Sequence, residues 1–307
     1  MTAAIQFERV GKVYKRFFSG ERIEALRDVS FAVSPGEVCG FLGPNGAGKT
    51  TSIGILMGFL LADSGQIRVL DFAPGDVRAK EQIGFLPENF SFYRFLTGPK
   101  LLALHLTLSG RRVPEAFSLI EGLLAQVKLA GYESLHIARY SRGMIQRLGI
   151  AQALIGDPQL LVFDEPTSGL DRAGRKEVLD LVHLLKRQGK TVFLSSHILA
   201  DVEQICDRVV IIDRGRLVRS GRLEEILNVG GRVEVVVGEL SDAGLAAAAN
   251  CGAEVDRGSH GIRLLVEPSR KRELIESLWA ARCDVVRVST VKDSLEDVFL
   301  KLVEGAS

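Results

Sequence analysis

A glycine-rich segment near the start of the chain has the residues of a phosphate-binding loop. It reads Gly43-Pro44-Asn45-Gly46-Ala47-Gly48-Lys49-Thr50, which fits the pattern G-x-x-x-x-G-K-[ST]. An apolar run precedes it, and a stretch with helical spacing, Thr50 to Leu61, follows it. Glycines let backbone N–H groups turn towards phosphate oxygens, and the positive end of a following helix adds to that attraction. We therefore predict a nucleotide site, with Lys49 reaching the β- and γ-phosphates and Thr50 coordinating Mg²⁺.

Two adjacent acidic residues follow a second apolar run, Leu160 to Phe163. This run is predicted to be a buried strand, which places Asp164 and Glu165 at its carboxyl end, where open α/β sheets bind ligands. Because successive residues of a strand point in opposite directions, the two acids are expected to have different roles. Asp164 suits Mg²⁺, directly or through water, and Glu165 suits the polarisation of an attacking water. Either acid could instead cap the strand, but that does not explain both beside a phosphate loop.

The elements that must position these residues alternate along the chain. Residues 5–14 alternate apolar and polar and are predicted to form an edge strand. Short buried strands are predicted at 38–42, 160–163 and 191–194, with helical stretches such as 177–188 between them. Strands that alternate with helices indicate a largely parallel sheet covered on both faces.

A second, smaller domain is predicted after a change of composition at residues 228–231, which we interpret as a linker. The predicted domains are therefore 1–228, which contains every phosphate-binding motif, and 229–307, a small α+β accessory domain. The expected elements of the accessory domain are strands at 232–237, 262–266 and 284–288 and helices at 269–281 and 294–303, with 246–249 a short alanine-rich helical piece. The last helix has an apolar stripe of Leu295, Val298, Phe299 and Leu302.

The composition is that of an ordinary globular protein and excludes several functions. Of 307 residues, 46% are hydrophobic and 25% charged, and 39 basic against 38 acidic side chains give a net charge of +1. This balance argues against a nucleic-acid partner. No apolar run reaches the roughly 18 to 20 residues that span a bilayer, so another chain would have to hold the protein at a membrane. The cysteines form no C-x-x-C pair and are predicted to be small core residues, Cys39, Cys206, Cys251 and Cys283.

A third segment connects these motifs to a known family. The residues Tyr140-Ser141-Arg142-Gly143-Met144-Ile145-Gln146-Arg147 resemble the signature L-S-G-G-Q-x-Q-R of ABC transporters. With Pro166-Thr167-Ser168-Gly169-Leu170-Asp171 and Ser195-Ser196-His197, residues 5–228 resemble an ABC transporter nucleotide-binding subunit. The resemblance implies an α/β P-loop ATPase domain with a helical subdomain, joined to the small C-terminal domain. It also implies ATP hydrolysis coupled to transmembrane transport, with ATP and Mg²⁺ bound.

The resemblance assigns further residues to the ATP site. Tyr14 would stack on adenine, and His197 would contact the γ-phosphate as a catalytic switch beside Glu165. Ser141 and Gly143 would complete the ATP site of another subunit, which is either a second copy of the chain or a homologous ATPase subunit. Asp171 would face that subunit. The implied ATP-binding residues are Tyr14, Gly43, Pro44, Asn45, Gly46, Ala47, Gly48, Lys49, Thr50, Thr51, Ser141, Gly143 and Asp171.

The sequence departs from the family pattern in two segments. The signature has Tyr140, Arg142 and Met144 where leucine, glycine and glutamine are common, and Arg142 is expected to turn outward. Ile83-Gly84-Phe85-Leu86-Pro87-Glu88 resembles the family's Q-loop, with an acid in place of glutamine. Glu88 is therefore expected to bind Mg²⁺, or a water on it, together with Thr50 and Asp164.

Both departures, and the ending Asp293 to Leu302, resemble the ATPase subunits of bacterial ABC-2-type exporters. This implies a transmembrane permease as partner, a peripheral location on the cytoplasmic side of the cell membrane and ATP-driven dimer closure. Selectivity for the exported substrate would sit mainly in the permease. The alternative is a soluble ABC ATPase that acts on ribosomes or DNA. The single set of motifs, the near-zero net charge and the absence of sustained heptads between Leu60 and Tyr140 argue against it.

Overall fold

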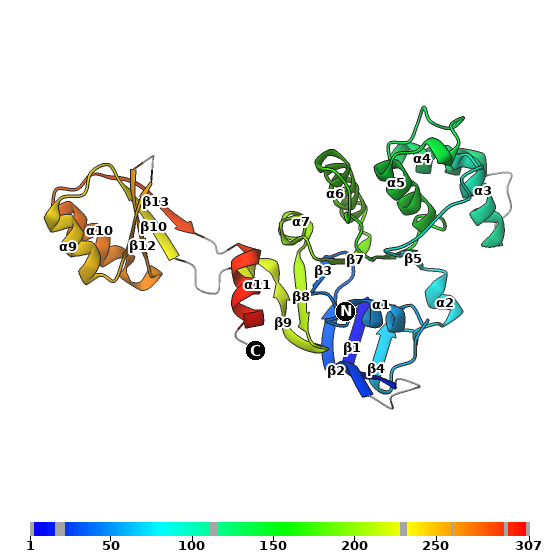
Figure 1. Ribbon diagram of the computed structural model, residues 1–307, viewed down its shortest axis with the longest axis horizontal. Coiled ribbons are helices and arrows are strands. Elements are labelled where there is room, and N and C mark those ends of the chain that lie inside the picture. The colour runs from blue at the N-terminus through cyan, green and yellow to red at the C-terminus, as the bar shows by residue number, and fades with distance from the viewer. Residues whose placement is uncertain are drawn as a thin grey trace. The chain divides into compact units, whose positions relative to one another are not determined.

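The computed structural model describes residues 3–15, 22–110, 116–227, 232–258, 261–291 and 294–304 (Figure 1). These residues form two compact units, one running to Leu223 and the other beginning at Glu224. The predicted linker, 228–231, lies outside the described residues, so a domain boundary after residue 228 stays a prediction.

The larger unit is built on a six-stranded sheet in the order β5-β6-β7-β3-β8-β9. Its strands are β3 (Val38–Leu42), β5 (Ile83–Leu86), β6 (Leu160–Phe163), β7 (Thr191–Ser196), β8 (Arg208–Asp213) and β9 (Arg216–Arg222). All neighbours are parallel except β9, which runs antiparallel to β8. Every residue of β3, β6 and β7 is buried, as expected for strands covered on both faces. The three predicted buried strands are therefore confirmed.

A separate antiparallel sheet in the order β2-β1-β4 packs against the first. It consists of β1 (Ile5–Lys15), β2 (Arg22–Val33) and β4 (Ser64–Val69). The prediction that β1 is an edge strand is wrong, because Ile5 pairs with Val33 on one side and with Val69 on the other. Alternating hydrophobicity reports which face of a strand is buried, and it carries no information about neighbours within the sheet.

Four phenylalanines join the two sheets of the larger unit. Phe7 stacks on Phe31 with ring centroids 4.5 Å apart, and Phe31 lies 6.1 Å from Phe193. Phe41 and Phe193 come from the neighbouring strands β3 and β7, and their ring centroids are 5.2 Å apart. These rings form the centre of a core that also includes residues of α1.

Seven helices of the larger unit are described, and they are α1 (Lys49–Leu56), α2 (Val77–Lys80), α3 (Gly98–Leu108), α4 (Ala116–Gln126), α5 (Arg142–Ala153), α6 (Arg172–Arg187) and α7 (Leu199–Ile205). Helices α3, α4 and α5 pack on one another as the helical subdomain (Figure 1). Helix α1 ends well before the predicted residue 61, because Gly58 adopts a positive φ of 72° that stops the helix. Helix α6 begins before the predicted residue 177, since Asp171 caps it by accepting a hydrogen bond from the Gly174 N–H group.

The smaller unit contains a four-stranded antiparallel sheet in the order β11-β12-β10-β13. Its elements are β10 (Arg232–Val237), α9 (Asp242–Asn250), β11 (Glu254–Gly258), β12 (Gly261–Val266), α10 (Lys271–Ala280) and β13 (Val285–Val291). This βαββαβ order is that of the ferredoxin-like motif. Alternate residues of β10, Val233, Val235 and Val237, form its core with α9 and α10. Strand β11 was not predicted, and α9 is longer than the alanine-rich piece.

The remaining described α-helices are α8 (Leu223–Leu227) and α11 (Leu295–Glu304). In α11, Leu295 and Val298 are buried, in agreement with the predicted apolar stripe. No described helix is both long and apolar enough to cross a lipid bilayer. All four cysteines are buried, as predicted.

Replacing Phe193 with alanine tests the aromatic contact between the sheets. Phe193 is 1% exposed and its removal leaves a cavity, so we expect Phe193→Ala to cost about 3–5 kcal/mol of stability in urea denaturation followed by circular dichroism. The matched control is Phe117→Ala on α4, where the side chain is 71% exposed and the expected loss is below about 0.5 kcal/mol. Similar losses for the two variants would show that the sheets do not depend on this contact.

Candidate active site

The phosphate loop connects the buried strand β3 to the start of α1. Gly46 and Gly48 have positive φ angles of 80° and 108°, which side chains rarely adopt. At Gly43 an added Cβ would lie 2.4 Å from the carbonyl oxygen of Ile212. The backbone path of the loop therefore favours glycine at these positions, as the motif predicted for Gly43 and Gly48. Lys49 is buried at the first position of α1, and its Nζ donates a hydrogen bond of 2.6 Å to the carbonyl of Gly43.

The loop lines a pocket of about 750 Å³ that gathers most of the predicted site residues. The predicted residues in its lining come from the loop, from α1 and from the carboxyl ends of three strands, and they are Pro44, Asn45, Gly46, Gly48, Lys49, Thr50, Thr51, Glu88, Asp164, Glu165 and His197. Pairing of β3 with β7, of β7 with β6 and of β6 with β5 brings these ends to one edge of the sheet. A site at the carboxyl ends of parallel strands was expected from the sequence.

Asp164 is buried at the end of β6, where its Oδ1 accepts a hydrogen bond of 2.5 Å from the hydroxyl of Ser195. Burial raises the pKa of the Asp164 carboxyl, and the nearby negative charges of Glu88 and Glu165 raise it further. The Ser195 hydrogen bond and the positive charge of Lys49 act in the opposite direction. The site therefore concentrates negative charge around Asp164 in a way that a cation would relieve.

Both carboxylate oxygens of Glu165 have a partner. Oε2 lies 2.7 Å from Nδ1 of His197 and accepts a 3.3 Å hydrogen bond from the His197 N–H group. Oε1 lies 3.8 Å from Nζ of Lys49. The two acids do not point in opposite directions as a continued strand would require. Strand β6 ends at Phe163 and Glu165 has a φ of 52°, so both acids line one pocket.

Ser195 joins the two acids, and the sequence analysis assigned it no role of its own. Its hydroxyl accepts a 2.8 Å hydrogen bond from the Glu165 N–H group and donates to Asp164. Ser195 is fully buried in β7, which pairs with both β3 and β6. A hydroxyl near the carboxyl end of an otherwise apolar strand is the signal that could have identified it.

Tyr14 lies beside the pocket near the end of β1. Its hydroxyl is 3.5 Å from the Thr51 hydroxyl, and Nζ of Lys12 lies 5.7 Å from the centre of its ring. The side chain is 38% exposed, which leaves part of the ring open to a ligand. The position suits the predicted stacking on a base next to the phosphate loop.

Six predicted site residues are not part of the pocket lining. Tyr14, Gly43 and Ala47 belong to β1 and to the phosphate loop, and the other three lie at the N-termini of two helices. Ser141 caps α5 by accepting a 3.2 Å hydrogen bond from the Met144 N–H group, and Asp171 caps α6. Gly143 lies in the first turn of α5. The N–H groups at such helix starts favour an anion. The structure therefore separates these residues from the phosphate loop of their own chain.

A second hollow, of about 450 Å³, separates the pocket from α5. Glu88 and Glu165 line both spaces, and Arg142 lines the hollow. Arg142 is exposed, as predicted, but it does not point freely into solvent. Its guanidinium lies against Gly169, where an added Cβ would be 2.3 Å from the guanidinium carbon. Arg142 thus joins the start of α5 to the loop before α6.

Comparisons with known proteins identify this arrangement. Residues 26–168 match the family model described as ABC transporter. An ABC transporter ATP-binding protein of Synechocystis sp., described as uncharacterized, is 40% identical over 95% of this chain and 82% of its own length. This chain belongs to the ABC transporter ATP-binding proteins. It is accordingly an ATP-binding subunit and an ATPase of that family, in agreement with the sequence analysis.

Two further relatives bear on what this ABC ATPase does. A bacitracin transport ATP-binding protein of Bacillus licheniformis is 34% identical over 92% of this chain and 94% of its own length. A solved structure, a dimeric ATP-binding cassette in a post-hydrolysis state with ADP and Pi, is 25% identical with a TM-score of 0.64. It covers 71% of this chain and 98% of its own length, in agreement with the predicted α/β P-loop fold.

Removal of the Ser195 hydroxyl tests whether it positions the two acids of this ABC ATPase. We expect Ser195→Ala to lower ATPase turnover about 10- to 100-fold, since both hydrogen bonds of the hydroxyl are lost. The control is Ser196→Ala in the same strand, where the hydroxyl accepts from the Ile198 N–H group and contacts neither acid. Steady-state rates over a range of Mg²⁺ concentrations provide the measurement. Equal turnover of the two variants would remove Ser195 from the site.

Proposed function

We propose that this ABC ATPase powers an ABC-2-type exporter, working as one of two ATPase subunits that close on ATP. One observation carries the proposal: the phosphate loop and the acids share a pocket, while Ser141, Gly143 and Asp171 lie outside it. A single chain thus holds ATP and the hydrolytic acids but directs its signature helix elsewhere. A second subunit that presents the same helix would complete the site.

ATP binding is proposed to use the whole pocket. Backbone N–H groups of the loop cradle the phosphates, and the N-terminal end of α1 adds its positive charge. Lys49 binds the β- and γ-phosphates in place of the Gly43 carbonyl that it contacts in this structure. The hydroxyl of Thr51 lies beside Tyr14, whose ring stacks on adenine at the outer end of the pocket.

The donors in the pocket fit Mg²⁺. Thr50, Glu88 and Asp164 supply hard oxygen ligands, which this ion prefers. The raised pKa of Asp164 reflects a buried negative charge among other acids, which a divalent cation would offset. Among the described residues, no group of three or more histidine, cysteine or acidic side chains is placed to hold a metal ion. Mg²⁺ is usually bound by one or two carboxylates together with substrate phosphates and water. When bound, Mg²⁺ would neutralise charge on the phosphates during transfer.

Hydrolysis is proposed to depend on Glu165 and His197. Glu165 accepts a proton from the attacking water, whose oxygen forms a bond to the γ-phosphorus as the bond to ADP breaks. His197 contacts the γ-phosphate and holds the Glu165 carboxylate through the contact of 2.7 Å. Departure of Lys49 to the phosphates frees Oε1 of Glu165, which the lysine faces at 3.8 Å in this structure. The base thus becomes available when ATP is present.

An exposed aromatic surface next to Glu88 supports a permease as partner. The side chains of Tyr93 and Phe95 are 60% and 72% exposed, and their ring centroids are 5.7 Å apart. A pocket of about 380 Å³ beside them is lined by Phe90 and Phe92 among other residues. Exposed apolar surface of this kind marks a protein contact. This surface lies within seven residues of Glu88 in the chain, so docking of a permease there would change the position of Glu88 in the ATP site. The contact would be made on the cytoplasmic side of the cell membrane.

Glutamine in place of Glu165 tests the proposed hydrolysis. The amide keeps the size of the side chain but cannot accept the proton, so we expect Glu165→Gln to bind ATP normally and to lose turnover by at least about 100-fold. It should accumulate as an ATP-dependent dimer in size-exclusion chromatography. Lys49→Ala serves as the contrasting variant, because it should lose nucleotide binding itself. Near-normal turnover of Glu165→Gln would refute the assignment.

Mixing two inactive variants tests the shared sites. Lys49→Ala protomers keep an intact signature helix, and Ser141→Arg protomers keep an intact phosphate loop. A mixed dimer therefore contains one complete site, and an equal mixture should recover roughly a quarter of wild-type ATPase activity. Each variant alone should stay inactive at every protein concentration. If the mixture is as inactive as its components, the ATP site lies within one chain.

A further inference from the structure

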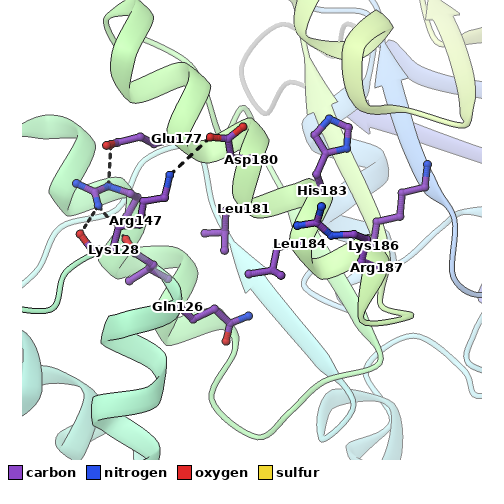
Figure 2. A pocket seen from close by; sticks show the side chains of 11 residues that line it. Gln126, Lys128, Arg147, Glu177, Asp180, Leu181, His183, Leu184, Lys186 and Arg187 are labelled. Carbon is purple, nitrogen blue, oxygen red and sulfur yellow. Dashed lines mark hydrogen bonds and ion pairs between the residues drawn. The ribbon is translucent and has the colours of Figure 1, made fainter.

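A buried arginine on the signature helix contacts two neighbouring helices of the larger unit. Arg147 lies on α5 and is only 8% exposed. One guanidinium nitrogen, Nη1, donates hydrogen bonds of 2.8 Å and 2.6 Å to the carbonyls of Val127 and Lys128, directly after α4. Its Nε lies 3.3 Å from Oε2 of Glu177 on α6, in an ion pair whose geometry does not make a hydrogen bond (Figure 2). A buried charge is costly without partners, so these contacts hold the side chain in one place.

The contact with α4 is a helix cap supplied by a different helix. Helix α4 ends at Gln126, and Lys128 has a positive φ of 56°, which ends the helical path. The last carbonyls of a helix lack partners within it and carry partial negative charge. Arg147 binds with its cation the two carbonyls that directly follow the helix, those of Val127 and Lys128. The end of α4 is therefore tied to α5 by hydrogen bonds to a charged group.

The contact of Arg147 with α6 lies on the same side of α5 as Gly143, which packs closely against Gly174 of α6. A Cβ added to Gly143 would lie 3.8 Å from the Cα of Gly174. Gly143 and Arg147 are four residues apart on α5, and Gly174 and Glu177 are three residues apart on α6. Both spacings place the pair on one face of its helix. The glycine contact and the ion pair are therefore successive contacts between the same two helix faces.

The space between Arg147, the end of α4 and α6 is not filled by packed side chains. A cavity of about 660 Å³ lies between the end of α4, Arg147 and α6 (Figure 2). Across it, Nζ of Lys128 is 3.6 Å from Oδ2 of Asp180 in an exposed ion pair. An exposed pair of this kind contributes little, whereas Arg147 is buried. Arg147 therefore contributes more to the register between the helical subdomain and α6 than this exposed pair does.

We propose that Arg147 is a positioning residue for the composite ATP site. Arg147 joins α4, α5 and α6 and thereby fixes the N-terminus of α5 relative to the N-terminus of α6. The first of these ends contains Ser141 and Gly143, and the second contains Asp171. Both ends face the other subunit in the proposed function, on which this inference rests. Arg147 thereby acts on the ATP of the partner subunit, and its own chain's phosphate loop does not depend on it.

The test compares two substitutions on α6 and one on α5, each in the full-length chain that carries Glu165→Gln. Glu177→Gln keeps the size of the side chain and removes the ion pair with Arg147. The matched control is Asp180→Asn, one turn further along the same helix, which removes the exposed pair with Lys128. Arg147→Lys keeps the positive charge but cannot reach three partners at once. Each protein is titrated with MgATP at low concentration, as a monomer, and then followed by analytical ultracentrifugation.

We expect Glu177→Gln and Arg147→Lys to weaken ATP-dependent dimerisation about tenfold, with the ATP affinity of the monomer unchanged. Asp180→Asn should dimerise like the parent. With Glu165 intact, Glu177→Gln should lower kcat about tenfold and leave the KM for ATP unchanged. If Glu177→Gln does not fold, Glu177→Asp, which keeps the charge but retracts it, is used for the same comparison.

Two results would overturn the inference. One is equal dimerisation of Glu177→Gln and the parent. The other is a joint loss of dimerisation, monomer ATP affinity and thermal stability, which would show that Arg147 only supports the fold. A parent that stays monomeric with ATP is a separate result, visible before any α6 substitution is made. It would overturn the proposed function, and the positioning role with it.

Discussion

Parallel pairing of β3, β6 and β7 is the constraint on which the rest of this ABC ATPase depends. In this register Leu42 pairs with Ser196, and Phe163 with Leu194, so the three strands end close together. The phosphate loop, the two acids and His197 all follow directly from these ends. Because every residue of the three strands is buried, a slip in register would expose the core as well as disperse the site.

The charged side chains at this edge of the sheet suit the binding of an anion, the nucleotide phosphates, together with a cation, Mg²⁺. Lys49 is buried with its ammonium held by loop carbonyls and facing Glu165. Asp164 is buried with its pKa raised by burial and by other acids. Neither the Lys49 ammonium nor the Asp164 carboxylate has its charge fully balanced by these contacts. Under the proposed function, a nucleotide phosphate draws the lysine away from the glutamate, and Mg²⁺ offsets the acids, so binding itself prepares the residues for hydrolysis.

The helical subdomain has a different task from the sheet. The sheet forms one side of the pocket, whereas the residues at the N-termini of α5 and α6 lie outside the pocket lining. Arg142 lies against Gly169, and Arg147 joins α4 to α6, so two arginines of the signature segment connect these helices. The residue that replaces a common glycine of the signature, Arg142, therefore has a structural partner within its own chain. Its side chain does not obstruct Gly143, which approaches Gly174 instead.

The features of this protein that depend on residues adjacent in the chain could be predicted from its sequence. The phosphate loop, the paired acids and the buried strands each depend on residues that are adjacent in the chain. The structure places them at the predicted edge of the sheet, although both acids point into one pocket. Glycine spacing requires a particular backbone path, and a continuous apolar run indicates a strand buried on both faces. The family resemblance added Tyr14, His197 and the signature helix. The structure puts the first two beside the loop and the helix outside the pocket.

Contacts between distant segments were decided only by the tertiary structure. Alternation along β1 could not show that the strand lies between β2 and β4, because a strand's neighbours come from elsewhere in the chain. The bridging role of Ser195 depends on β7 lying beside β6, and the turn of Glu165 into the pocket depends on a φ of 52°. Arg147 has partners on two other helices. Motifs specify which groups are available, and packing determines which of them meet.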